Sequence, residues 1–227
     1  MSTVYFVATP IGNLDDLTLR AKNILSQVDC ILAEDKRVTS KLLAHYEIQK
    51  PLLVWQQHSK MADWQKIKNL LQEDKDLALV TDAGTPGVSD PGGMLIEKII
   101  LEFPEVKIVP IPGASAMTTL MSVAGIALDK FLFLGFLPHK NGRQTLITQI
   151  KESKIPVIFF ESVHRISKTL DALAGSDKQI ILGRELTKTF ETIYRGTAQE
   201  LKNILEKNPS QVKGEFVIIV DSYVRKK

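Results

Sequence analysis

Polar and charged residues follow several of the strands that the sequence predicts, and these residues could do chemistry. The clusters are Thr9–Asp16, Glu34–Arg37, Asp82–Asp90, Glu161–Arg165 and Arg184–Lys188. Each stands directly after an apolar run, so strand ends that converge on one cleft would gather them. Any one of them could be only a capped helix start, but clusters from both halves of the chain favour a shared cleft.

The loop at 81–93, TDAGTPGVSDPGG, contains the highest density of turn residues, and it follows the apolar run Leu77–Val80. Glycines let a backbone approach a bound molecule closely, and prolines hold the shape of a loop. A structural turn between a strand and a helix usually needs only one or two such residues. We therefore expect this loop to bind a ligand.

Several common sites are not supported by their motifs. The sequence has no GxxxxGK[ST] phosphate loop, no GxGxxG dinucleotide fingerprint and no GxSxG esterase elbow. The histidines are scattered without metal-ligand spacing, so we expect no metal site. What remains is a cleft of backbone groups, small residues and a few charges, which suits a bulky organic cofactor.

Composition places the chain among ordinary soluble enzymes. It has 227 residues, 44% of them hydrophobic and 24% charged, with a net charge of +3. No strong global field would draw it to nucleic acid or a membrane, so any RNA contact must come from a local patch. Cys30 is the single cysteine, which excludes an internal disulfide and fits the cytoplasm. We expect neither a membrane span nor a signal peptide.

Apolar runs alternate with helical patterns in the first half of the chain. The pattern predicts strands at 5–8, 30–33, 52–55, 77–80 and 107–111, and helices at about 18–27, 61–72 and 94–103, with another helix from the cluster Glu34–Arg37 to about His45. This alternation predicts an α/β fold with a mostly parallel sheet covered on both faces.

A break at Pro112 and Gly113 suggests two α/β domains, 1–113 and 114–227. The second half predicts strands at 131–138, 157–160, 180–183 and 216–220, with another at 191–196. Helices are expected at about 142–152, 164–174 and 197–206. The strands of this half should mix their directions more than those of the first.

Eight motifs in order along the chain resemble the tetrapyrrole-methylase-like family of S-adenosylmethionine-dependent methyltransferases. They are ATPIGNLDDLTLRA, AEDKRVTSKLL, VTDAGTPGVSDPG, PIPGASA, GFLPHK, FESVHR, GRELTK and KGEF. Tetrapyrrole enzymes would show GxGPGD where this sequence has TPIGN. The chain is therefore most similar to the branch that methylates the 2′-hydroxyl of a cytidine ribose in the decoding region of bacterial small-subunit (16S) ribosomal RNA.

This resemblance implies a class III methyltransferase fold of two α/β domains, with S-adenosylmethionine in the interdomain cleft and usually a homodimer. It implies ribosomal RNA within the small subunit as the partner, and no membrane. Carried over motif by motif, it places the cofactor beside Pro10, Ile11, Asp82, Gly84, Thr85, Val88, Ser115, Ala116, Phe160, Leu186 and Phe216.

Three departures from the family pattern matter. Lys36 stands where AEDTR has threonine, and Val163 replaces a proline or threonine before His164. We also expect the sequence to lack the small C-terminal helical extension of longer family members, which could help hold RNA.

A ribose 2′-hydroxyl has a high pKa, so methyl transfer to it needs a proton acceptor or cations that stabilise the developing alkoxide. The catalytic candidates are Glu34, Asp35, Arg37, Glu161, His164 and Arg165, together with Arg184, Glu185 and Lys188. The alternative for all of them is an ion-pair network. We expect RNA phosphates to meet a local patch of Lys36, Arg37, Lys140, Arg143 and Arg165.

Two other functions remain open at this point. One is methylation of a small molecule such as a tetrapyrrole, against which the TPIGN start argues. The other is a cofactor-binding RNA or ribosome-assembly protein without turnover.

Overall fold

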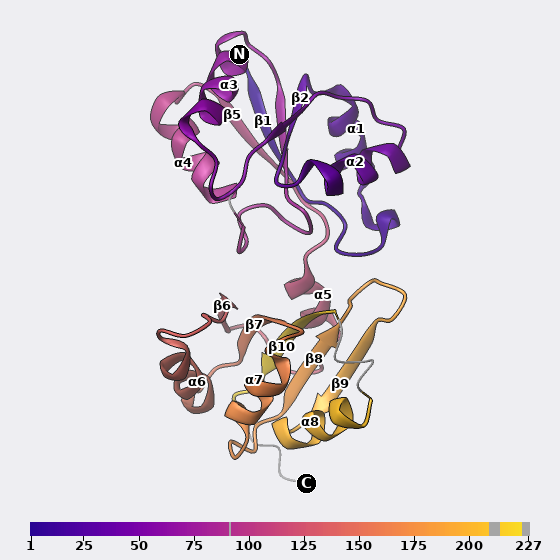
Figure 1. Ribbon diagram of the computed structural model, residues 1–227, viewed down its shortest axis with the longest axis vertical. Coiled ribbons are helices and arrows are strands. Elements are labelled where there is room, and N and C mark those ends of the chain that lie inside the picture. The colour runs from indigo at the N-terminus through magenta and orange to yellow at the C-terminus, as the bar shows by residue number, and fades with distance from the viewer. Residues whose placement is uncertain (91, 209–213, 224–227) are drawn as a thin grey trace. The chain divides into compact units, whose positions relative to one another are not determined.

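A five-stranded sheet organises each of the two units into which the chain divides, Met1–Ser115 (unit 1) and Ala116–Lys227 (unit 2). The computed structural model describes residues 1–90, 92–208 and 214–223 (Figure 1). The division falls two residues after the expected boundary between 113 and 114.

The sheet of unit 1 is parallel throughout, with the order β3-β2-β4-β1-β5. Its strands are β1 (Thr3–Val7), β2 (Cys30–Ala33), β3 (Leu52–Val54), β4 (Leu77–Val80) and β5 (Lys107–Ile111). Every residue of β2 and β4 is buried. Strands buried on both faces read as continuous apolar runs, and this is why the sequence predicted them.

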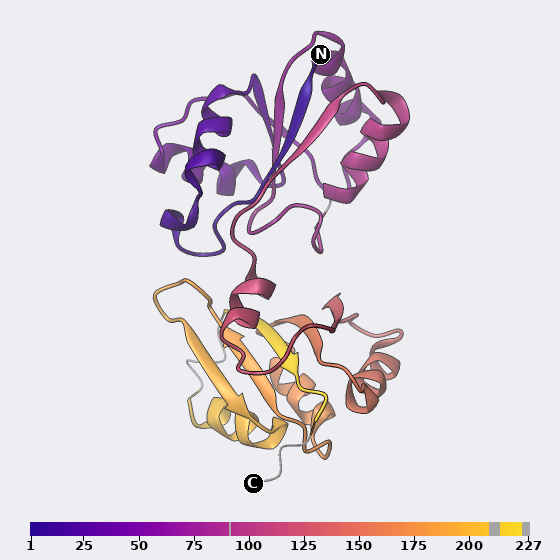
Figure 2. The same ribbon diagram turned by 180° about the vertical axis from the view of Figure 1, so that it is seen from behind.

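Helices cover both faces of this sheet (Figures 1 and 2). On one face, α3 (Met61–Gln72) and α4 (Gly92–Glu102) form a core that includes Trp64 and Ile99. On the other, α1 (Leu19–Gln27) and α2 (Lys36–His45) form a core that includes Leu25 and Leu43. A short 3₁₀ helix, η1 (Leu14–Asp16), precedes α1. Thr18 caps α1 as predicted, because its hydroxyl accepts from the Ala21 N–H at 3.1 Å.

The sheet of unit 2 is mixed, as predicted, with the order β6-β7-β10-β8-β9. Its strands are β6 (Leu132–Phe136), β7 (Val157–Ser162), β8 (Ile180–Arg184), β9 (Thr192–Gly196) and β10 (Glu215–Val220). β6 and β7 are parallel, and β10 is antiparallel to both β7 and β8. β6, β7 and β8 therefore run in one direction and end at the same edge of the sheet.

Three helices cover one face of this sheet, namely α6 (Arg143–Glu152), α7 (Ile166–Leu173) and α8 (Ala198–Lys207). They bury Phe159, Leu182 and Ile218. The neighbouring residues on these strands point to the other face, where α5 (Ala116–Ser122) packs against β10. A Cβ at Gly183 would lie 2.9 Å from Leu120 Cδ1, so glycine lets α5 approach this face.

The predicted strand at 157–160 was too short at its C-terminal end. β7 continues to Ser162 because Glu161 and Ser162 pair with Phe216 and Glu215 of β10. This pairing joins residues far apart in the sequence, so the polar character of 161–162 concealed it. In the parts of the chain that the structure describes, no helix has both the length and the apolar character needed to cross a bilayer.

Candidate functional site

Loops after β1, β4 and β5 are tied together at the carboxyl edge of the unit 1 sheet. Thr9 and Gly84 exchange main-chain hydrogen bonds of 2.9 and 3.0 Å. The Thr9 hydroxyl donates to Thr81 O at 3.1 Å, and the Thr85 hydroxyl donates to Ala114 O at 3.1 Å. Ligands of open parallel sheets bind at this edge, and the bonds fix its shape.

Gly84 occupies a position at which a side chain would be strained. Its φ of +83° lies in the left-handed region, and a Cβ there would lie 3.5 Å from Ile11 Cγ2 and 3.7 Å from Ala114 O. Pro10 and Ile11 beside it are buried. Ile11 of the first predicted cofactor motif and Gly84 of the second therefore lie next to each other.

Asp90 folds the rest of the glycine-rich loop onto itself. Its carboxylate accepts from the N–H groups of Gly87 at 2.7 Å, Val88 at 3.2 Å and Gly92 at 2.7 Å. Ser89 takes a positive φ of 65° inside this turn. Pro91 of the same motif lies outside the described residues. Sequence reasoning placed Val88 beside the cofactor but gave no role to Asp90, because its bonds depend on the folded loop.

Thr81 is a second residue that sequence reasoning missed. It follows β4 directly, is 3% exposed, and its hydroxyl has no hydrogen-bond partner within the described part of the chain. A buried hydroxyl without a partner costs free energy unless a ligand or water satisfies it. The hydroxyl is enclosed by protein atoms, so it reflects the packing behind the loop after β4.

Glu34 and Asp82 connect the loop after β2 to the loop after β4 through hydrogen bonds. The Asp82 N–H donates to Glu34 Oε2 at 3.2 Å, and the Asp35 N–H donates to Asp82 Oδ1 at 3.1 Å. These carboxylates border an open hollow of about 420 Å³ lined also by Lys36, Val54 and Gln56. Two of the predicted polar clusters, Glu34–Arg37 and Asp82–Asp90, are therefore in contact through these residues.

The carboxyl groups of this acidic cluster differ in basicity. Burial raises the pKa of Glu34; the hydrogen bond from Asp82 N–H opposes this rise, and the nearby carboxylates add to it. Burial also raises the pKa of Asp82. Hydrogen bonds from Arg37 instead lower the pKa of Asp35 to about 2. Glu34 and Asp82 are thus the better proton acceptors.

Arg37 and Asp35 form a local pair at the start of α2. Asp35 Oδ1 accepts from the Arg37 N–H at 2.8 Å and caps the helix, while the Arg37 guanidinium lies 2.6 Å from Asp35 Oδ2. The Arg37 side chain is 88% exposed. The helix-cap alternative that the sequence allowed for Asp35 is therefore present, and the catalytic roles of both residues stay predictions.

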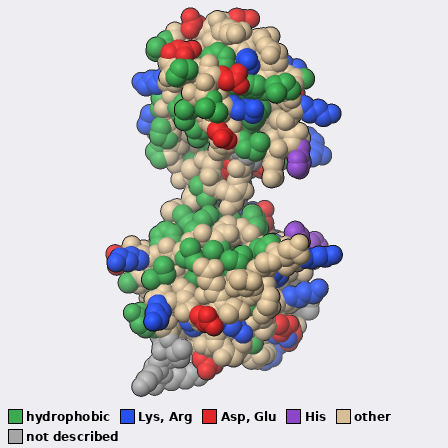
Figure 3. All heavy atoms as spheres, turned by 90° about the vertical axis from the view of Figure 1, so that its left-hand side faces the viewer, with side chains coloured by type: hydrophobic (Ala, Val, Ile, Leu, Met, Phe, Trp, Pro, Cys, Tyr) green, Lys and Arg blue, Asp and Glu red, His purple; other side chains and the backbone are tan. Residues whose placement is uncertain are grey.

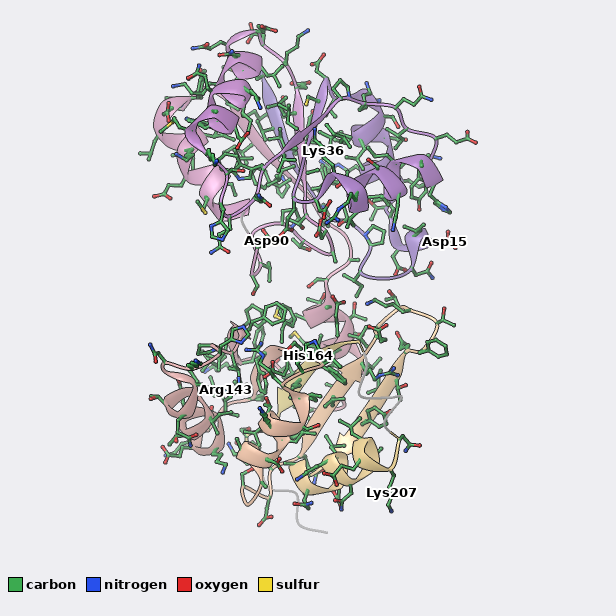
Figure 4. The ribbon with its side chains drawn as sticks, in the orientation of Figure 1. Asp15, Lys36, Asp90, Arg143, His164 and Lys207 are labelled. Atoms are coloured by element: carbon green, nitrogen blue, oxygen red, sulfur yellow. The ribbon has the colours of Figure 1, made fainter. Side chains whose placement is uncertain are left out.

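Glu161 lies at the centre of a buried ion-pair network in unit 2. Figure 4 labels Arg143, a member of this network, and His164 of the same unit. Its side chain is fully buried; Oε1 lies 2.7 Å from Arg165 Nε, and Oε2 lies 3.1 Å from an Arg143 NH₂ nitrogen. The Thr169 hydroxyl also donates to Oε2 at 2.7 Å, and Ser162 N–H donates to Oε1 at 2.8 Å. We name Glu161, Arg143 and Arg165 the Glu161 clamp.

The Glu161 clamp holds the loop that follows β6. Arg165 donates to Leu137 O at 2.6 Å, and Arg143 donates to Pro138 O at 3.3 Å. The two arginine side chains are only 14% and 18% exposed, which leaves little of either guanidinium for an RNA phosphate. This geometry favours a positioning role for Glu161 and Arg165 over the predicted catalytic one. His164, in the turn after β7, is exposed.

The loop after β8 is also internally bonded. Glu185 Oε1 accepts from Lys188 Nζ at 2.9 Å and from Glu215 N–H at 3.0 Å, and Arg184 donates to Phe190 O at 3.1 Å. A Cβ on Gly214 would collide with the Glu185 side chain. The ion-pair alternative allowed for Arg184, Glu185 and Lys188 is therefore what the contacts favour. Lys213 of the KGEF motif lies outside the described residues.

The remaining predicted cofactor residues differ in what they can offer. Phe160, Ser115 and Ala116 are half-buried. Leu186 is 6% and Phe216 2% exposed, and the Phe216 side chain packs in the core under the helices. A ligand would meet mainly the main chain of Phe216. The described ranges contain no group of His, Cys, Asp or Glu side chains arranged to hold a metal ion.

Comparison with known proteins gives consistent matches. The sequence profile of the family described as Tetrapyrrole (Corrin/Porphyrin) Methylases matches residues 3–202. The Haemophilus influenzae protein named Ribosomal RNA small subunit methyltransferase I is 42% identical over 222 residues, covering 96% of this chain and 78% of that protein. The Bacillus subtilis protein of the same name is 41% identical over 226 residues, covering 97% and 75%.

Among solved structures, that of a cobalamin biosynthetic enzyme, cobalt precorrin-4 methyltransferase, superposes with a TM-score of 0.69 at 17% identity. The match covers 99% of this chain and 96% of that one. At this identity the likeness shows the fold alone.

Proposed function

The chain belongs to the tetrapyrrole (corrin/porphyrin) methylase family, and we propose that it methylates the 2′-hydroxyl of a cytidine ribose in the decoding region of small-subunit (16S) ribosomal RNA. S-adenosylmethionine is its methyl donor. The observation that carries the proposal is the similarity of nearly the whole chain to small-subunit rRNA methyltransferases, at 42% identity over 96% of its length. The ribose and the cytidine rest on the motif resemblance, above all on TPIGN at 9–13.

When bound, the cofactor supplies an electrophilic methyl group on a sulfonium, so the protein has to provide alignment and electrostatics. The carboxyl edge of the unit 1 sheet is suited to hold it. Gly84 offers bare main chain beside the buried Ile11 side chain. The bonds made by Asp90 fix the loop before any ligand arrives, which reduces the entropy lost on binding.

Deprotonation of the ribose hydroxyl is the step for which the acidic cluster is suited. Glu34 and Asp82 line the hollow at this edge, and the raised pKa of each makes it a stronger base than an ordinary carboxylate. We propose that one of them accepts the proton. Arg37 stands beside them with an exposed guanidinium that suits a phosphate or a developing alkoxide.

The proposal extends to the setting of the enzyme. A ribosomal RNA substrate would place it in the cytoplasm, and we retain the homodimer as a prediction from the family resemblance. Methylation of a tetrapyrrole is the competing function within the family. The similarity to a precorrin methyltransferase is at 17% identity, so it gives no support to that substrate.

The acceptor can be identified by offering two substrates to the purified protein with tritium-labelled S-adenosylmethionine. We expect tritium in the RNA of small ribosomal subunits that lack the modification, and none in uroporphyrinogen. Transfer to the tetrapyrrole alone would exclude the proposal. Cofactor binding in calorimetry without transfer to either acceptor would instead favour the assembly protein without turnover.

A further inference from the structure

Three phenylalanine rings form a cluster on the face of the unit 2 sheet opposite α6, α7 and α8. The centroid of the Phe160 ring lies 5.2 Å from that of Phe133 and 5.3 Å from that of Phe136. Phe133 and Phe160 are half-buried, whereas Phe136 is 56% exposed. The cluster therefore presents one ring to solvent on a support of aromatic neighbours.

A bulge in β6 creates this arrangement. Phe133 and Phe136 are three residues apart and would face opposite sides of a regular strand. The register between β6 and β7 shifts between them, because Phe133 pairs with Ile158 but Phe136 pairs with Phe160. Gly135 supplies the positive φ of 59° within the bulge. Bulges re-aim side chains near functional sites, and this one turns Phe136 onto the Phe160 ring.

Lysine and histidine side chains lie in the two loops that follow β6 and β7. His139 and Lys140 are exposed in the loop after β6, and His164 is exposed in the turn after β7. Because β6 and β7 are parallel, both loops leave the sheet at the edge where Phe136 lies. The space-filling view shows hydrophobic side chains gathered on one face of unit 2, with histidine and basic side chains at the margin (Figure 3).

The Glu161 clamp fixes this edge and adds no negative charge to it. Its arginines hold Leu137 O and Pro138 O, the residues between Phe136 and His139. One carboxylate stands against two guanidiniums, so the clamp as a whole is cationic. The loop that leads to His139 and Lys140 is thus held in a defined shape.

We propose that Phe136 is a stacking platform for an unpaired base of the RNA substrate, with His139, Lys140 and His164 contacting the flanking phosphates. An exposed aromatic ring beside a cationic track is the pattern that single-stranded RNA recognition uses. This inference rests on the proposed function and deepens it.

The test compares Phe136→Ala with Phe190→Ala, which removes another exposed phenylalanine of unit 2, 70% exposed, outside the cluster. Binding is measured by fluorescence anisotropy with a fluorescein-labelled single-stranded RNA oligonucleotide and with the same oligonucleotide annealed to its complement. We expect Phe136→Ala to bind the single strand about 5-fold to 100-fold more weakly and the duplex almost normally, because paired bases cannot stack on a protein ring. Phe136→Tyr should bind nearly as the wild type does.

The variant Lys140→Ala distinguishes the contribution of positive charge to RNA binding from the contribution of base stacking. It should weaken binding to the single strand and to the duplex alike and lower the slope of affinity against salt by about one. Phe136→Ala should leave that slope unchanged.

Several outcomes would overturn the platform. The platform is rejected if Phe136→Ala and Phe190→Ala bind the single-stranded RNA with equal affinity. A loss of S-adenosylmethionine affinity in calorimetry would identify the cofactor as the occupant, and a change from dimer to monomer in light scattering would identify a second copy. Methyl transfer by the wild type to small subunits is measured in parallel. If the wild type methylates the subunits normally and Phe136→Ala binds the single strand as the wild type does, this inference alone is rejected. If the wild type neither binds nor methylates RNA, the proposed function is rejected as well.

Discussion

Carboxylates lie at the carboxyl edges of both sheets, but the two units hold them in different ways. Glu34 and Asp82 in unit 1 accept main-chain N–H groups from each other's loops and border an open hollow. Glu161 in unit 2 is 1% exposed and is held by Arg143, Arg165 and Thr169.

The difference shows which carboxylates are available for chemistry. A carboxylate bound only by amides keeps lone pairs for a proton, and its raised pKa helps it to take one. A carboxylate between two guanidiniums has its lone pairs occupied, so it acts through the loop that its partners hold. We therefore propose that proton transfer belongs to unit 1 and that the Glu161 clamp of unit 2 has a positioning role.

The largest effect should follow from Glu161→Gln. Removing this charge leaves two poorly exposed guanidiniums without their carboxylate, so we expect the free energy of unfolding to fall by roughly 2–4 kcal/mol. Urea denaturation measures it. Glu34→Gln is the matched control and should change stability by less than about 0.5 kcal/mol, because the amide oxygen can still accept from Asp82 N–H. Equal losses in the two variants would contradict the comparison.

Gly84→Ala should have the next largest effect, which we expect on the affinity for the cofactor. It places a Cβ at φ +83° against Ile11 and Ala114, whereas Gly87→Ala has similar strain at φ +91° but nothing within 4 Å. Strain alone costs about 1 kcal/mol and is shared by both variants. We expect calorimetry to show a loss of S-adenosylmethionine affinity at least tenfold greater for Gly84→Ala. Similar losses would mean that Gly84 does not touch the cofactor.

Asp82→Asn should separate stability from activity through its pH dependence. The folded pKa of Asp82 is raised, so the native state holds this proton more tightly, and the wild type loses stability as the pH rises through that pKa. Asparagine keeps the acceptor for Asp35 N–H and does not titrate. The variant should melt at an equal or higher temperature than the wild type at neutral pH, and the advantage should disappear in acid.

Methyl transfer by Asp82→Asn should nevertheless fall at neutral pH. The contradicting result is a variant that melts below the wild type at neutral pH and matches it in acid. That result would show that the ionised Asp82 carboxylate stabilises the fold. Its role would then resemble that of Glu161.

The secondary structure of unit 1 was largely predictable, whereas the roles of its carboxylates were not. The strands at 30–33, 77–80 and 107–111 and the helix at 61–72 match the structure to the residue, because buried parallel strands are apolar runs and amphipathic helices are periodic. The ends of β7 and the bulge at Gly135 depend on pairing with distant strands, which local pattern does not contain.

Part of the candidate site was likewise predictable from local sequence, and part was not. The glycine-rich loop was predictable from its composition. The partnering of Glu161 with Arg143 joins residues 18 positions apart, and the buried hydroxyl of Thr81 follows from packing. Arg143 was predicted as a phosphate contact because it was expected in a loop at the mouth of the cleft, yet its guanidinium is engaged inside unit 2.

The smallest effect on stability should come from Arg37→Ala. The Arg37 side chain is 88% exposed, so water and salt screen its pair with Asp35 and the pair should add little to stability. We expect single-turnover methyl transfer to fall more than RNA binding does. Unchanged turnover in the folded fraction, measured beside thermal melting, would exclude a catalytic or substrate-orienting role for Arg37.

The identity of the methylated atom tests the central claim most directly. Small ribosomal subunits lacking the modification are incubated with the wild-type protein and S-adenosylmethionine, and the ribosomal RNA is digested to nucleosides for mass spectrometry. We predict the appearance of 2′-O-methylcytidine in a single fragment of the decoding region. A methyl group on a base, on another nucleoside or on a ribosomal protein would contradict it.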